Sequence, residues 1–256
     1  MRRAFDVSIA HATRLIAGAV LLATLSTGPV NGQALRCRPF SNEPVAAPTP
    51  RTAQSAVDRF EKIKAAVTAE SYRVLFLGDS ITERFDDTVW REDMMPRGVL
   101  NSGVNGDRTE NLLWRMQHGN LDGQPPTGVV VLIGTNDLTN GGEGRSPEAT
   151  ADGIRANLEY LRQRLPRARI VLLGLYPRSI SPEARLRRGT VAVNQLIREC
   201  GDDVWIKYAD IGTILLEPDG RLSPTISPDA LHFTEAGYRR LAPRLNPLID
   251  WLLGKR

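Results

Sequence analysis

Histidine and cysteine are scarce in this sequence, whose 256 residues include three histidines and two cysteines. A protein-bound zinc ion usually takes about three or four His, Cys or carboxylate ligands, and no two of these histidines have the spacing of a helical zinc-binding pair. The sequence also contains neither the GxxxxGK[ST] loop that cradles nucleotide phosphates nor the GxGxxG loop of dinucleotide-binding proteins. We therefore expect no metal site and no cofactor.

Long runs of one charge are also missing. The formal net charge is +4, and basic residues are interspersed with acidic ones instead of forming a block. Proteins that bind nucleic acid usually gather Lys and Arg on one surface, so we expect no nucleic-acid partner. The composition, 41% hydrophobic and 24% charged, is typical of a folded globular protein and excludes a disordered chain.

The N-terminal apolar run is too short for a membrane-spanning helix. Residues 15–25 (LIAGAVLLATL) follow a basic stretch and precede small residues that end at Ala34. A spanning helix needs about 20 apolar residues, whereas this layout is typical of a secretory signal peptide. We predict a leader over 1–34, cleavage after Ala34, export to the periplasm or the medium, and no stable membrane insertion after cleavage. An uncleaved membrane anchor is the alternative.

The rest of the chain divides into a short lead-in and one domain. Residues 35–55 hold four prolines and are predicted to be extended, and 56–256 form the predicted catalytic domain. Export would place Cys37 and Cys200 in an oxidising compartment, where they could form a disulfide. Two separate thiols are equally compatible with the sequence, because it does not place them within bonding distance.

Short apolar runs alternate with helical patterns along the domain. The runs are 72–77, 99–100, 128–133, 168–175 and 204–209. Runs rich in Val, Ile and Leu are typical of parallel strands buried on both faces, and alternation with helices predicts a doubly wound α/β domain. The last helical segment begins at Glu235, and we expect its Pro243 and Pro247 to bend or split it.

Polar turns follow the first three predicted strands. They are Gly78-Asp79-Ser80, Gly103–Asp107 and Gly134–Asp137. Ligands of such sheets bind at the carboxyl ends of the strands, so we expect these turns to meet at one rim.

One histidine is placed to act as a base. Asp229 precedes His232 by three residues, and a carboxylate at that distance can orient an imidazole toward a hydroxyl nucleophile. Ser80 is the best candidate for that hydroxyl. Thr82 stands where the GxSxG motif requires its second glycine, which argues against an ordinary α/β-hydrolase.

Acyl transfer also needs donors for an oxyanion, and the same rim offers them. The candidates are the backbone N–H groups of Ser80 and Gly106 and the side-chain amide of Asn136. Each of these motifs alone is more often a helix cap or a turn, so the prediction depends on their combination. The arginines in 176–188 are expected to form a solvated face; binding of an anionic or sugar substrate is the alternative.

The motifs stand in a recognisable order. They are 78–82 (GDSIT), 101–107 (NSGVNGD), 134–137 (GTND) and 229–234 (DALHFT). In this order they resemble the GDSL, or SGNH, hydrolase family, with Ile81 in place of the family's Leu. Residues 111–121 also resemble the branch that contains the platelet-activating-factor acetylhydrolase catalytic subunits.

The resemblance implies a fold and a reaction. The fold would be a flavodoxin-like three-layer α/β/α sandwich with a five-stranded parallel sheet. Ser80 would be the nucleophile, His232 the base and Asp229 its orienting partner, with Ser80, Gly106 and Asn136 forming the oxyanion hole.

The expected protein is a serine-dependent carboxylic ester hydrolase that acts on short-chain esters, acetyl above all, of small molecules or carbohydrates. Thioesterases and lysophospholipases use the same motifs and are alternatives, as is an exported protein that binds carbohydrate or envelope material without turnover. No sequence feature indicates an oligomeric state.

Overall fold

The computed structural model describes residues 34–139 and 144–255, so the predicted leader lies outside it apart from Ala34. Among these described residues, no helix is both long enough and apolar enough to cross a membrane.

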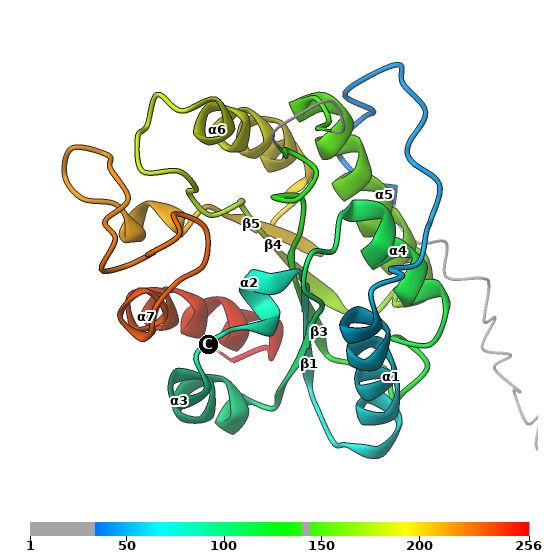
Figure 1. Cartoon of the computed structure of the whole chain (residues 1–256). Coiled ribbons are helices and arrows are strands. Elements are labelled where there is room, and N and C mark those ends of the chain that lie inside the picture. The colour runs from blue at the N-terminus through cyan, green and yellow to red at the C-terminus, as the bar shows by residue number, and fades with distance from the viewer. Residues whose placement is uncertain (1–33, 140–143, 256) are drawn as a thin grey trace, which may run out of the picture. The chain divides into compact units, whose positions relative to one another are not determined.

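A single sheet of five parallel strands forms the centre of this part of the chain (Figure 1). Its order is β2 (Val99–Gly103), β1 (Val74–Gly78), β3 (Gly128–Leu132), β4 (Arg169–Leu173) and β5 (Ile206–Ala209). Every residue of β1 and β3 is buried, which explains why these strands read as continuous apolar runs. The strand order is that of flavodoxin-like folds, so the predicted fold class is confirmed.

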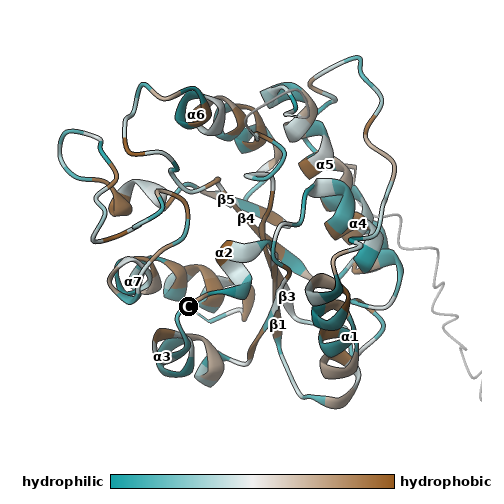
Figure 2. Ribbon diagram, in the orientation of Figure 1, coloured by the Kyte–Doolittle hydropathy of each residue, from teal (hydrophilic) through white to brown (hydrophobic). Residues whose placement is uncertain are grey.

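Helices cover both faces of the sheet (Figure 1). One face carries α1 (Gln54–Ala69), α4 (Thr109–Gln117), α5 (Pro147–Arg164) and α6 (Arg185–Ile197). The other carries α3 (Asp87–Val89) and α7 (Glu235–Leu252), and the short α2 (Ser80–Glu83) follows β1. Short turns of 3-10 or π-helix complete the chain at Trp90–Met94, Met95–Arg97, Arg198–Cys200 and Gly212–Leu215. Apolar residues line the strands and the inner sides of the helices (Figure 2).

Helix α7 is not split at its prolines, which was one of the two outcomes expected for it. It runs without interruption from Glu235 to Leu252, and Pro243 and Pro247 lie exposed on its outer side. An internal proline costs a helix about 3 kcal/mol. Burial of an apolar side chain stabilises by about 1.5–3 kcal/mol, and α7 buries a whole face of them (Tyr238, Leu241, Ala242, Leu245, Ile249 and Leu252). The packing of that face holds the helix together through both prolines.

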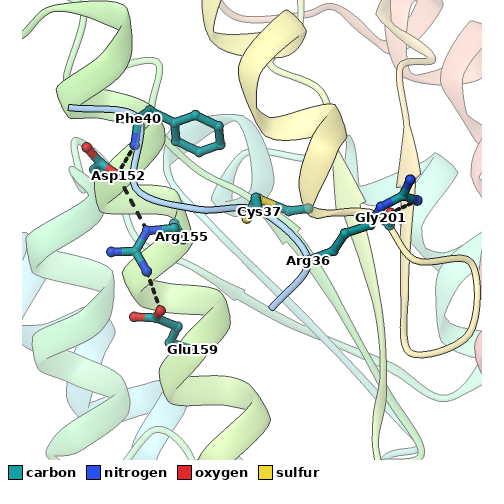
Figure 3. The surroundings of a disulfide bond; sticks show 8 residues. Arg36, Cys37, Phe40, Asp152, Arg155, Glu159 and Gly201 are labelled. Carbon is teal, nitrogen blue, oxygen red and sulfur yellow. Dashed lines mark hydrogen bonds and ion pairs between the residues drawn. A yellow bond between two sulfur atoms is a disulfide. The ribbon is translucent and has the colours of Figure 1, made fainter. Parts of the chain in front are cut away.

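The lead-in segment is ordered although it has no regular secondary structure before α1 begins at Gln54. Cys37 forms a disulfide with Cys200, which decides between the two states that the sequence left open (Figure 3). The carboxylate of Asp152 on α5 accepts hydrogen bonds from the backbone N–H groups of Phe40 and Ser41, at 2.9 and 2.8 Å. The segment is therefore fastened to the helical face that carries α5.

Candidate active site

Ser80 lies where strand β1 ends, as the first residue of α2. The helix begins there because the Asp79 side chain accepts a hydrogen bond from the N–H of Ile81, at 2.9 Å, and so caps it. The Ser80 residue is only 2% exposed. Its hydroxyl is thus held at the rim of the sheet on a short, fixed turn.

His232 and Asp229 reach Ser80 from the loop that precedes α7. His232 Nε2 lies 2.8 Å from Ser80 Oγ, and His232 Nδ1 lies 2.7 Å from Asp229 Oδ2. The other carboxylate oxygen of Asp229 accepts the backbone N–H groups of Leu231 and His232, at 3.0 and 2.7 Å. This tight turn brings the three residues predicted from the sequence into one hydrogen-bonded chain, although 152 positions separate Ser80 from His232.

The Asp229 carboxylate is stabilised in its charged form. Partial burial alone would raise its pKa, but hydrogen bonds from the His232 ring and from the backbone of His232 and Leu231 outweigh burial and hold the pKa of Asp229 below its usual value. A charged carboxylate favours a proton on the facing Nδ1. Nε2 is then free to accept the Ser80 proton.

The aromatic packing behind this loop keeps the imidazole in place. Phe233, the residue after His232, packs edge-on against Tyr176 and Tyr238, with ring centroids 5.9 Å apart in both pairs. Tyr238 donates a hydrogen bond to the carbonyl of Ile81 at 2.7 Å. The same core cluster therefore supports both the His232 loop and the Ser80 helix.

Gly106 and Asn136 lie in adjacent turns of the same rim. Gly106 has a φ of +76°, a left-handed conformation that favours glycine. The Asn136 amide donates one hydrogen bond to the carbonyl of Asp107, at 2.9 Å, which leaves its second N–H available. Among residues 34–139 and 144–255, the backbone N–H groups of Ser80 and Gly106 have no hydrogen-bond acceptor. Three donors at one rim are thus available to a negatively charged oxygen.

A buried ion pair that the sequence analysis missed supports the Gly106 turn. Arg115 of α4 is 2% exposed, and its Nε lies 2.7 Å from Asp107 Oδ2. Arg115 also donates to the carbonyls of Gly78 and Ser102, at 2.9 and 2.8 Å, so it links the ends of β1 and β2. Burial raises the pKa of Asp107 to about 6 in spite of Arg115. The only sequence signal was that Arg115 lies within 111–121.

A second missed network holds the turn that contains Asn136. Asp137 is fully buried and accepts hydrogen bonds from the hydroxyl of Thr109 and from Arg145, both at 2.7 Å. Arg145 also pairs with Glu110 at 2.7 Å. Burial raises the pKa of Asp137 to about 6, and it raises the pKa of Asp79 to about 7. Sequence reasoning could not separate these carboxylates from ordinary surface ones.

The arginines in 176–188 do not form the solvated face that we expected. Arg187 is 4% exposed and donates to the backbone carbonyls of Arg178, Ser179 and Gly220. The half-buried Arg178 donates to the Thr135 carbonyl at 2.6 Å, next to Asn136. Only Arg185 and Arg188 are exposed. The two inner arginines satisfy loop carbonyls near the rim, which apolar residues could not do.

Among the described residues, no cluster of three or more His, Cys, Asp or Glu side chains is arranged to bind a metal. His118 caps the C-terminus of α4 and stacks on Trp114, with its Nδ1 2.7 Å from the Trp114 carbonyl.

Comparison with known proteins gives consistent matches. The profile of the GDSL-like lipase/acylhydrolase family matches residues 76–240. The platelet-activating factor acetylhydrolase IB subunit alpha2 of Rattus norvegicus is 36% identical over 182 residues, which are 70% of this chain and 77% of that protein.

Solved structures share the fold. A GDSL-like lipase from Bacteroides thetaiotaomicron has a TM-score of 0.63 and 20% identity over 77% of this chain and 98% of that one. An acetylxylan esterase from Geobacillus stearothermophilus has a TM-score of 0.55 and 17% identity over 72% of this chain and 95% of that one. The family profile spans well over half of the sequence and contains every residue of the rim described above. The chain therefore belongs to the GDSL-like lipase/acylhydrolase family and is a GDSL-type hydrolase.

Proposed function

We propose that this protein hydrolyses short-chain carboxylic esters, acetyl esters above all, through a covalent acyl-enzyme on Ser80. The observation that carries the proposal is the hydrogen-bonded chain from Ser80 Oγ through the His232 ring to Asp229, with contacts of 2.8 and 2.7 Å. A serine hydroxyl is a weak nucleophile until a neighbouring base takes its proton, and this chain supplies the base and its orienting partner.

The first half of the reaction acylates Ser80. His232 Nε2 takes the hydroxyl proton while Oγ bonds to the ester carbonyl carbon, and the carbonyl electron pair moves onto oxygen. When the tetrahedral intermediate collapses, the bond to the alcohol oxygen breaks, and the imidazolium returns its proton to that oxygen. Asp229 stabilises the imidazolium throughout, because its lowered pKa keeps it charged.

The second half releases the acid. A water molecule attacks the acyl carbon and gives its proton to His232, and Ser80 Oγ leaves with that proton. The His232 side chain is 23% exposed, so solvent can reach it. In both halves the oxyanion is held by the N–H groups of Ser80 and Gly106 and by the second N–H of Asn136.

Two observations support an acetyl or similarly short acyl group. The rat relative at 36% identity is an acetylhydrolase, and an acetylxylan esterase shares the fold. We infer that the substrate is an acetyl ester of a small molecule or of a carbohydrate. Because the same side chains serve thioesterases and lysophospholipases, the acyl length and the leaving group are the quantities to measure.

We also propose that the protein is exported and that its leader is removed after Ala34. The basic start and the short apolar run of the N-terminus support this proposal, since they match a signal peptide. The Cys37–Cys200 disulfide supports it independently, because such bonds persist in oxidising compartments and are rare in the cytosol. N-terminal sequencing of the protein from its own cells tests this, and a mature N-terminus at Met1 would contradict it.

The test of the catalytic proposal compares residues 35–256 with the Ser80→Ala variant on p-nitrophenyl acetate, butyrate and octanoate. We expect turnover highest on acetate and lower by about 10⁴-fold or more in the variant, since the nucleophile acts as a unit with its base. Hydrolysis that Ser80→Ala leaves unchanged would refute the assignment. Absence of turnover by the folded protein on any ester would favour the non-catalytic binding protein.

A further inference from the structure

Arg51, at the end of the lead-in segment, lies against the Gly106 turn. We propose that Arg51 is a positioning residue of the oxyanion hole: its guanidinium holds the turn so that the Gly106 N–H faces the substrate. The inference rests on the proposed function of Gly106 as an oxyanion donor. It also adds to the active site a segment that lies outside the part of the chain matched by the family profile, residues 76–240.

Arg51 contacts Gly106 directly, through its guanidinium group. Arg51 Nη1 donates a hydrogen bond to the Gly106 carbonyl at 2.8 Å. A Cβ placed on Gly106 would lie 2.7 Å from Arg51 Nη2, so the guanidinium lies against the Cα of this glycine. Arg51 itself is half-buried. A charged donor in a partly dry position makes a stronger hydrogen bond than a neutral or fully exposed one.

An oxyanion donor must keep a fixed position, so the Gly106 turn needs an anchor. Gly106 adopts a left-handed φ of +76°, and as a glycine it has access to many other conformations. Its N–H must stay without a protein partner if it is to bind an oxyanion. Gly106 can therefore be held only through its neighbours and through the next peptide group, which consists of the Gly106 carbonyl and the Asp107 N–H. Asp107 N–H bonds to the Val104 carbonyl at 3.2 Å, and Arg51 supplies the bond to the Gly106 carbonyl.

The chain delivers Arg51 from a segment that is anchored along its length. The N–H of Thr49 donates to the Glu110 carbonyl at 3.3 Å, and the Thr49 carbonyl accepts the Asn111 amide at 2.9 Å. Pro50 fixes the backbone dihedral just before Arg51. Farther back, Asp152 accepts hydrogen bonds from the N–H groups of Phe40 (Figure 3) and Ser41, and Cys37 ties the segment covalently to the domain. The segment that carries Arg51 is therefore held against the domain both at the anchor residues of Figure 3 and at Thr49, so the position of Arg51 is fixed by the fold.

The experiment compares Arg51→Met and Arg51→Lys with the matched control Arg38→Met, all in the mature chain of residues 35–256. Arg38 is an exposed arginine of the same segment. With p-nitrophenyl acetate we expect Arg51→Met to lower kcat by about 10- to 100-fold at nearly unchanged KM, because a misplaced donor affects the transition state more than ground-state binding. Arg51→Lys should recover part of the loss, and Arg38→Met should behave as the wild type.

A second readout does not depend on turnover. Amide hydrogen exchange of residues 103–108 should become faster in Arg51→Met and stay unchanged in Arg38→Met, since the turn loses an anchor. A kcat and an exchange rate that both match the wild type would overturn the proposal. So would a loss of activity that follows only from a smaller folded fraction. If the wild type hydrolyses no ester, the proposed function fails, and the exchange measurement alone then decides whether Arg51 holds the turn.

Discussion

Removal of the Cys37–Cys200 disulfide should destabilise the protein strongly. The double variant Cys37→Ser/Cys200→Ser leaves both positions polar and similar in size, and it avoids a single unpaired thiol. The two cysteines are 163 positions apart in sequence, so the bond closes a long loop that contains strands β1 to β4. Without it, the unfolded chain gains the conformational freedom of that loop.

The magnitude follows from the length of the loop. The chain-entropy relation gives about 5 kcal/mol at 25 °C for a loop of this length, the upper end of measured effects. For a domain of this size each kcal/mol shifts the unfolding midpoint by about 2–4 °C, so we expect a decrease of about 10–20 °C. The full effect requires that the lead-in segment stays docked until the domain unfolds. Two observations support that condition. Asp152 holds the segment through its hydrogen bonds to Phe40 and Ser41, and Cys200, the other end of the disulfide, is fully buried.

The assay is thermal and urea unfolding of the oxidised wild type, the reduced wild type and the double variant. The last two should share one midpoint, because they lack the same bond, and that agreement controls for the substitutions themselves. A variant midpoint within about 2 °C of the oxidised wild type would refute the reasoning, since the lead-in segment would then detach before the domain unfolds.

Two further predictions concern the rim. Asn136→Ala should lower kcat by about 10²–10³ with little change in KM, because it removes one oxyanion donor. Steady-state kinetics on p-nitrophenyl acetate measure this, and a kcat within about threefold of the wild type would exclude Asn136 from that role. Asp79→Asn should stabilise the protein at high pH. Burial raises the pKa of Asp79 to about 7, so folding takes up a proton and the wild type loses stability as pH rises from about 4 to 7. The variant keeps an oxygen for the Ile81 N–H without the charge, so its advantage should approach at most about 4 kcal/mol above pH 7 and vanish near pH 4. Urea unfolding at both pH values checks this, and an equal advantage at both would count against a buried charge.

The strands and the polar turns after them could be predicted because their signals are local. Strand β3 reads as an uninterrupted apolar run, and its burial on both faces requires that composition. Helix α5 begins at Pro147 with the Ser146 side chain as its cap, and a Ser-Pro pair is a local signal for the start of a helix. In α7 the two prolines do not split the helix, because the energy of packing its buried face exceeds their local cost.

The candidate site was predictable for a different reason. Ser80, Gly106, Asn136, Asp229 and His232 lie in short motifs whose order along the chain is itself informative, so neither distance nor burial was needed to select them. The arginines of 176–188 had no comparable signal. Arg187 and an exposed Arg188 are neighbours in the sequence, and only the fold places one in the interior and the other in solvent.

The class of fold, the order of its elements and the residues of the candidate catalytic chain could be predicted, because each depends on local periodicity or on a short motif. Three contacts could not be predicted in this way: Cys37 meets Cys200, Arg115 and Asp107 form a buried pair beneath the rim, and Arg51 reaches the Gly106 carbonyl. These contacts join residues on separate elements. Their strength depends on distance and burial, which exist only once the sheet and its helices have assembled.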